Sequence, residues 1–171
     1  YSTSNRSIIH HDKAKGLRGP LLMDLNNDGW LDIAGQAEDG KIKLWWGNKG
    51  SFSDHHFQEI DLGRPEHLMY IKGADFNKDG WLDLLLPKRR PHGNINTSFI
   101  YYGSEKGFSN TNRIEIEADM PYQNSIADFD KNGWLDIFMT SYGTDLSGNR
   151  PSKIHWGSKK GFLNKPVAKL Y

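Results

Sequence analysis

Three nine-residue stretches carry oxygen-bearing side chains at the same four positions. They read DLNNDGWLD at 24–32, DFNKDGWLD at 75–83 and DFDKNGWLD at 128–136. Alternate residues of a tight loop point the same way, so oxygens at the first, third, fifth and ninth positions converge on one centre. The predicted side-chain ligands are Asp24, Asn26, Asp28, Asp32, Asp75, Asn77, Asp79, Asp83, Asp128, Asp130, Asn132 and Asp136.

Two further positions of each loop fit the same chemistry. The seventh residue (Trp30, Trp81 or Trp134) is placed to add its backbone carbonyl. Glycine at the sixth position permits the sharp turn, because it takes positive φ without a Cβ clash. All-oxygen ligation with three carboxylates per loop suits a hard divalent cation, and loose geometry with five or more donors favours Ca²⁺ over Mg²⁺. The sequence therefore predicts three Ca²⁺ sites.

An EF-hand opens in the same way but does not fit. Its bidentate Glu at position twelve is replaced here by Gly35, Leu86 and Met139, and apolar strand-like runs stand where helices should follow. The plainer alternative is an acidic turn that binds nothing. Three copies in register weigh against that alternative, since chance matches to a short motif are not expected to repeat.

Composition limits the remaining classes. The 171 residues include 36% hydrophobic and no Cys, so disulfides, thiolate metal sites and cysteine nucleophiles are excluded. No apolar run is long enough to cross a membrane. Moderate Ca²⁺ affinity is useful where calcium is plentiful, which favours an extracellular, cell-surface or periplasmic location. Without the nine loop acids, 12 Asp and Glu face 22 Lys and Arg, so the calcium-loaded protein should tolerate anionic partners.

A second signature follows each loop: WWGNKGSF at 45–52, YYGSEKGF at 101–108 and HWGSKKGF at 155–162. It is typical of a strand end and a glycine-bearing hairpin turn. Four short strands per repeat are expected. The first strands are 19–23, 68–74 and 124–127, and the second are 31–36, 82–87 and 135–141. The third strands lead up to the aromatic pairs at 45–46, 101–102 and 155–156. The fourth strands are 57–62, 113–118 and 165–170.

Four antiparallel strands repeating about every 50 residues predict an all-β fold of β-propeller blades. The predicted limits are 19–62, 63–118 and 119–171 for three blades, with 1–18 as the outer strand of a preceding blade and its connection. The two signatures together resemble the FG-GAP or VCBS-type repeats of integrin α-subunit propellers and many bacterial secreted proteins. The resemblance implies Ca²⁺ in the hairpin between the first two strands of each blade.

Three blades are fewer than the four to eight of closed propellers. An arc would leave apolar blade faces, with residues such as Leu84 and Phe138, partly bare to water. We therefore expect partners that close the ring: either remaining blades of a longer chain, which is the favoured interpretation, or a second copy.

Ligand recognition is expected on the connections opposite the calcium loops, because they vary between repeats. They supply a basic cluster and two tyrosines that could stack on a sugar. The candidate ligand-binding residues are Arg64, His67, Lys88, Arg89, Arg90, His92, Tyr122 and Tyr142.

Two functions remain open at this point. The favoured one is a non-enzymatic calcium-binding module for adhesion to a glycan or protein. The alternative is part of a polysaccharide lyase or another carbohydrate-active enzyme, in which His, Tyr, Arg and Lys would abstract a proton and neutralise a uronate. No nucleophile elbow, phosphate loop or zinc spacing supports catalysis. No nucleic-acid-binding motif is present, so we expect no nucleic-acid partner.

Overall fold

The computed structural model describes residues 17–49, 51–53, 55–63, 67–89, 97–141, 151–162 and 167–170. Within these ranges the protein is all-β and contains no helix, as the sequence predicts. The strands are β1 (Arg18–Met23), β2 (Asp32–Gln36), β3 (Ile42–Trp45), β4 (Phe57–Ile60), β5 (His67–Leu68), β6 (Lys72–Ala74), β7 (Asp83–Leu86), β8 (Lys88–Arg89), β9 (Thr97–Tyr101), β10 (Arg113–Glu117), β11 (Pro121–Ala127), β12 (Asp136–Ser141), β13 (Ser152–His155) and β14 (Ala168–Leu170).

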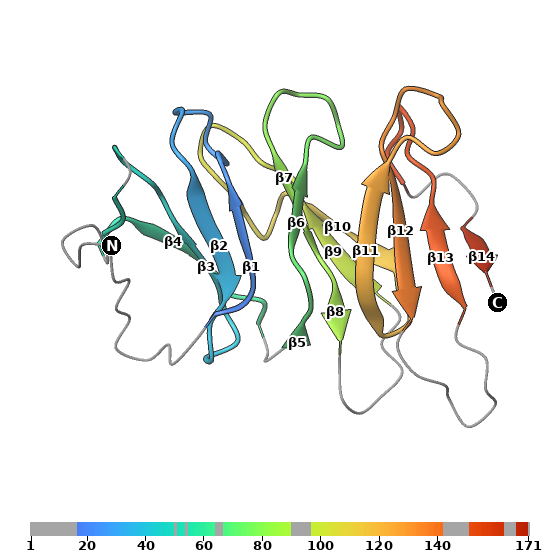
Figure 1. The fold of residues 1–171 in the computed structure, drawn as a ribbon, viewed down its shortest axis with the longest axis horizontal. Coiled ribbons are helices and arrows are strands. Elements are labelled where there is room, and N and C mark those ends of the chain that lie inside the picture. The colour runs from blue at the N-terminus through green and yellow to red at the C-terminus, as the bar shows by residue number, and fades with distance from the viewer. Residues whose placement is uncertain are drawn as a thin grey trace, which may run out of the picture.

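The strands form three antiparallel sheets of four strands each. Their orders are β1-β2-β3-β4, β6-β7-β9-β10 and β11-β12-β13-β14. Figure 1 shows them standing side by side along the long axis, as the vanes of a propeller do. The described residues include no helix able to span a bilayer. Each sheet corresponds to one copy of the repeat, and we refer to them as blades one, two and three.

The inner hairpin of each blade breaks register at a corresponding place. In blade one the pairing jumps between Arg18 and Leu21, and in blade three between Pro121 and Asn124. In blade two the first strand splits into β5 and β6, with β5 paired to β8 and β6 to β7. A break that recurs three times is a feature of the repeat, because bulges persist where they re-aim a strand.

The apolar core lies between blades. One cluster joins blades one and two, with Leu44 on one side and Leu84 and Leu86 on the other. A second cluster joins Leu85 of blade two to Ile137 and Met139 of blade three. Strand β7 is therefore buried on both faces, which explains why it is apolar at every position after Asp83.

This packing corrects one expectation about the bare faces. Leu84 is completely buried because its side chain points toward blade one. Phe138 corresponds to Leu85 in the repeat, so it points toward the side where a following blade would stand, and it is only half-buried. Phe138 therefore lies on an open face, whereas Leu84 does not.

Candidate metal centre

The three oxygen-rich loops occupy corresponding places in the fold. Each follows the first strand of a blade (β1, β6 or β11) and leads into the second (β2, β7 or β12). Figure 1 shows the three loops at the same edge of the row of blades. They are strand-to-strand hairpins, so the EF-hand alternative is wrong for these residues.

The first residue of each loop organises the turn. In the first copy, Asp24 Oδ1 accepts a hydrogen bond from Asp28 N at 3.1 Å, and Oδ2 accepts one from Gly29 N at 2.9 Å. Asp75 and Asp128 repeat this pair of bonds. The sixth-position glycines have φ of 86°, 91° and 86°, as predicted for the turn.

The backbone conformation at the fourth position of the loop was not predicted. Asn27, Lys78 and Lys131 all lie in the left-handed region, with φ of 57°, 60° and 58°. Asn tolerates this conformation and Lys does so less readily. The backbone conformation is therefore the same in each repeat whatever the residue type, which indicates that the side-chain bonds of the first residue impose the turn.

The ninth residue has a structural task in addition to the predicted one. Asp32, Asp83 and Asp136 are completely buried. Asp83 Oδ2 accepts a hydrogen bond from Phe76 N at 2.8 Å, and Oδ1 accepts one from Gly103 N at 2.9 Å. Asp32 and Asp136 make the equivalent bonds. Each carboxylate thus joins its own loop to the aromatic–aromatic–Gly signature of the same blade, which explains why the two signatures occur together.

Burial of these carboxyls opposes their ionisation. Desolvation raises the pKa of Asp83 to about 7, with a smaller contribution from the negative charges of Asp79 and Asp75. Desolvation also raises the pKa of Asp32. A bound cation would favour the ionised form, because an opposite charge lowers the pKa of a neighbouring carboxyl.

Carboxylates converge most clearly in the third loop. Single oxygens of Asp128, Asp130 and Asp136 all lie within 4.8 Å of one another. These residues occupy the first, third and ninth positions. In the other two loops the third position is Asn, so the same three positions offer two carboxylates and an amide oxygen. Three oxygens from positions separated in this way suit a hard cation such as Ca²⁺.

The fifth-position side chain accepts hydrogen bonds within its own loop. Asp28 Oδ1 accepts a hydrogen bond from Trp30 N at 2.8 Å, Asp79 Oδ1 accepts one from Trp81 N at 2.9 Å, and Asn132 Oδ1 accepts one from Trp134 N at 2.8 Å. In the first two loops the other oxygen of the Asp accepts from the third-position Asn. Ligation by these residues, and by the carbonyls of the tryptophans, stays a prediction.

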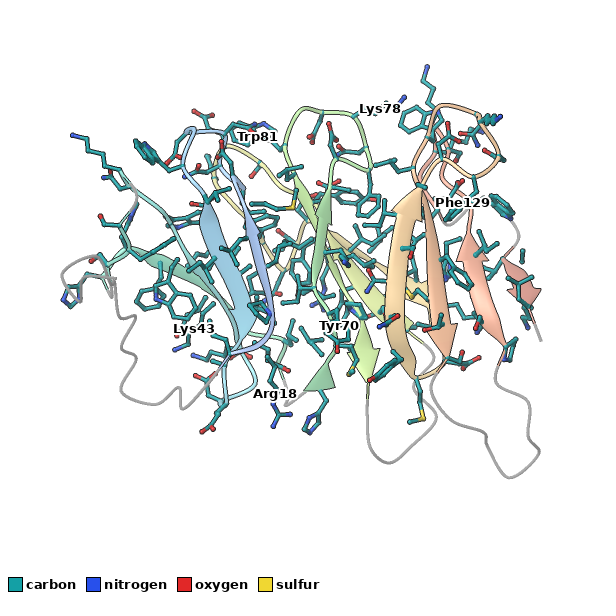
Figure 2. The ribbon with its side chains drawn as sticks, viewed as in Figure 1. Arg18, Lys43, Tyr70, Lys78, Trp81 and Phe129 are labelled. Carbon is teal, nitrogen blue, oxygen red and sulfur yellow. The ribbon has the colours of Figure 1, made fainter. Side chains whose placement is uncertain are left out.

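Neighbouring loops touch through their fourth residues. Asn27 Nδ2 donates to Gly80 O at 2.8 Å, and Lys78 Nζ lies 4.6 Å from the ring centre of Trp134. Lys78 and Trp81 lie at the loop edge in Figure 2. The loops therefore contribute to contact between blades as well as to the candidate metal sites.

The other predicted ligand residues do not form one described cluster. His67 is exposed and its Nδ1 lies 3.0 Å from Arg18 Nη1, while the ring of Tyr122 packs edge-on against Tyr70. Lys88 was expected on a surface loop, but it lies in β8 with 2% exposure and its ammonium 4.3 Å from the Phe99 ring centre. Arg89 is described only for its backbone in β8. Outside the described residues lie Arg64, Arg90, His92 and Tyr142.

The sheets and the loops together define a repeat protein built of β-propeller blades. Residues 24–86 match the family model for the FG-GAP-like repeat. The chain is 27% identical over 143 residues to integrin alpha-6 of Homo sapiens, in a match that covers 74% of this chain and 12% of the integrin. Residues 24–86 thus form an FG-GAP-like repeat, and the likeness to integrin alpha-6 extends over most of the chain.

Proposed function

We propose that the protein is an extracellular or cell-surface β-propeller module for adhesion, stabilised by Ca²⁺ and directed at a glycan or protein ligand. The observation that carries the calcium part is the convergence of Asp128, Asp130 and Asp136 in a loop of the repeat. The likeness to an integrin α-subunit supports adhesion and a location outside the cell.

The role of Ca²⁺ in this proposal is structural. Each ninth-position Asp places a carboxylate in a dry environment beside other acids, which is unfavourable without a counter-charge. Ca²⁺ bound to the first, third and ninth residues would supply that counter-charge. The same ninth carboxylates hold the hairpin turns of the blades, so binding of the ion would stabilise the whole blade.

The proposed partners include whatever covers the open blade faces. Phe138 and Ile154 are half-buried, whereas their counterparts Leu85 and Ile100 in blade two are completely buried by blade three. Further blades of the same chain, or a second copy, would bury these side chains in the same way. Recognition of the ligand by the variable connections stays a prediction.

Removal of metal tests whether Ca²⁺ stabilises the fold. At about 2 mM Ca²⁺, a site with a Kd of about 0.1 mM stabilises the fold by about 1.8 kcal/mol. One such site raises the melting temperature of a domain of this size by about 4–7 °C, and three raise it further. We expect EDTA to lower the melting temperature and excess Ca²⁺ to restore it, with Mg²⁺ restoring less. A melting temperature that EDTA leaves unchanged would show that the loops do not bind the ion.

A further inference from the structure

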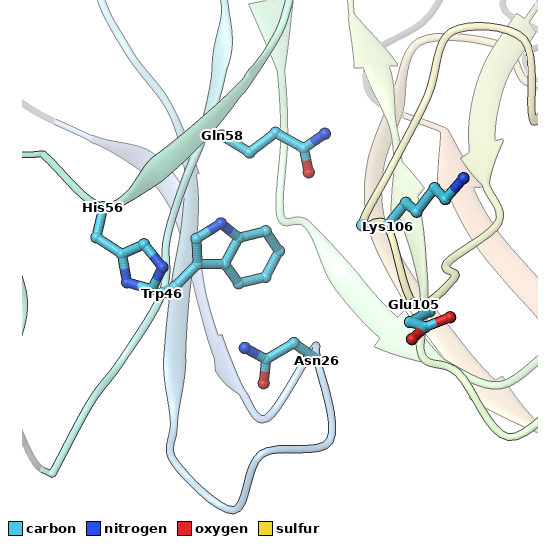
Figure 3. A pocket seen from close by; sticks show the side chains of 7 residues that line it. Asn26, Trp46, His56, Gln58, Glu105 and Lys106 are labelled. Atoms are coloured by element: carbon cyan, nitrogen blue, oxygen red, sulfur yellow. The ribbon is translucent and has the colours of Figure 1, made fainter.

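A pocket of about 350 Å³ lies between blades one and two, at the calcium-loop edge. Figure 3 shows the indole of Trp46 at its centre, with His56, Gln58 and Asn26 around it and Glu105 and Lys106 on the opposite wall in blade two. Gly107 completes the lining. This pocket is called the Trp46 pocket below, and none of its lining residues is among the predicted ligand-binding residues.

The walls of the Trp46 pocket are held at a fixed separation. Gln58 spans the two blades: its Nε2 donates to Phe108 O at 2.6 Å, and its Oε1 accepts from Phe108 N at 3.1 Å. A second link joins Asn110 Nδ2 to Asp61 O at 2.9 Å. Because these bonds tie the two blades together, the pocket needs little ordering on binding, which favours affinity.

Glycine at position 107 keeps the pocket open. Its φ is 76°, and a Cβ there would lie 2.5 Å from Gln58 Oε1 and 3.5 Å from Trp46 Cζ2. A side chain would therefore disturb the link between the blades and cover the edge of the indole.

The corresponding junction between blades two and three is filled by apolar packing. There Tyr102 packs against the second core cluster as Trp46 packs against the first, but apolar Ile114 stands in the place of Gln58 and packs there as well. The Tyr102 hydroxyl lies 3.8 Å from the Cβ position of Gly161. An apolar side chain can therefore fill this junction in the repeat. Packing between blades does not require the polar lining of the Trp46 pocket.

The chemistry of the lining selects a class of ligand. An aromatic plate stacks on an apolar molecular face, while Gln58, His56 and the charged pair offer donors and acceptors at its rim. Glu105 and Lys106 carry opposite charges, so the lining does not favour an anion or a cation. A pyranose ring combines an apolar C–H face with a rim of neutral hydroxyl groups, and the volume lies at the small end of ligand pockets.

We propose that the Trp46 pocket binds a neutral sugar ring at the end of a glycan, with the ring stacked on Trp46 and its hydroxyl groups bonded to the polar residues around it. This inference rests on the proposed adhesion function and specifies one ligand class and one site for it.

The test uses the whole chain in about 2 mM Ca²⁺. An array of neutral mono- to tetrasaccharides ending in hexoses, deoxyhexoses or N-acetylhexosamines identifies a bound glycan, and calorimetry measures its Kd. We expect Trp46→Leu to weaken binding at least tenfold, because aromatic residues in such pockets dominate affinity. Trp46→Tyr restores the residue type that blade two uses and should keep the Kd within about fivefold.

Two further variants keep the test decisive if Trp46→Leu fails to fold. Glu105→Ala should weaken binding at least threefold, because a hydrogen bond to a charged group is lost. Lys159→Ala, at the same turn position in blade three, should leave the Kd unchanged. Glycan binding that neither Trp46→Leu nor Glu105→Ala alters would overturn the pocket assignment and leave the adhesion function standing. Absence of binding to every neutral glycan would overturn the sugar assignment, while the EDTA melt still judges the calcium part independently.

Discussion

At the scale of single residues, the ninth position of the loop carries more than metal chemistry. Asp32, Asp83 and Asp136 each use both oxygens to accept backbone N–H groups from two separate turns. A carboxylate oxygen has more than one lone pair, so these bonds leave capacity for a cation. The residue type is therefore required twice, once by the hairpin and once by the predicted ion.

Substitution of Asp83 separates these two tasks. Asp83→Ala leaves Phe76 N and Gly103 N buried without an acceptor, at about 1–3 kcal/mol for each group. We expect the free energy of unfolding to fall by about 2–5 kcal/mol in urea denaturation, in EDTA as well as in Ca²⁺. The matched control is Asp79→Ala, at an exposed position. It should lower the free energy of unfolding by less than Asp83→Ala does in EDTA. A loss confined to Ca²⁺ would show that Asp83 acts through metal alone.

At the scale of strands and loops, the repeated pattern in the sequence was sufficient to predict the blades. Strand β2 begins within a residue of its expected start, because the metal loop ends at a fixed Asp. The split of the expected 68–74 strand into β5 and β6 was not predicted, since it depends on a register break that leaves no signal in residue type. The hydrogen bonds of the fifth loop position are set by the local turn, and the burial of Lys88 depends on packing between elements; periodicity encodes neither.

Charge at the third loop position should determine which loop binds Ca²⁺ most tightly. Asp130 converges with Asp128 and Asp136, whereas Asp79 at the fifth position of loop two accepts from Trp81 N instead. Both substitutions to Asn remove one negative charge. We expect Asp130→Asn to weaken the tightest site at least about tenfold, and Asp79→Asn to weaken its own site less, because Coulomb energy falls with distance.

Competition with a chromophoric chelator measures these affinities. Asn77→Asp adds the missing third-position carboxylate to loop two and should strengthen that site. Equal losses in Asp130→Asn and Asp79→Asn would instead mean that the fifth residue turns inward when the ion binds.

At the scale of the whole molecule, blades two and three each pack a phenylalanine against the metal loop of the blade before. Phe162 of blade three packs edge-on against Phe76, the second residue of the preceding metal loop, with ring centres 5.4 Å apart. Phe108 shares a core cluster with Leu25 in the corresponding way. Leu25 and Phe76 are only 2% and 4% exposed, but Phe129, at the same position of the third loop, is 44% exposed. Figure 2 shows Phe129 at the loop edge of blade three, where no following phenylalanine covers it.

The open side of blade three should therefore drive association of the 171-residue chain when no other blade covers it. Apolar side chains left bare at Phe129, Phe138 and Ile154 favour burial against another surface, and exposed patches of this kind mark interfaces. In sedimentation experiments at about 50 µM, a concentration suited to weak interfaces, we expect species heavier than a monomer. Lys in place of Phe129 and Phe138 should return the chain to a monomer, whereas Leu170→Lys on the outermost strand should not. A wild-type chain that is monomeric and melts cooperatively would mean that three blades suffice, because the open face of blade three would then cost too little free energy to require a closed ring.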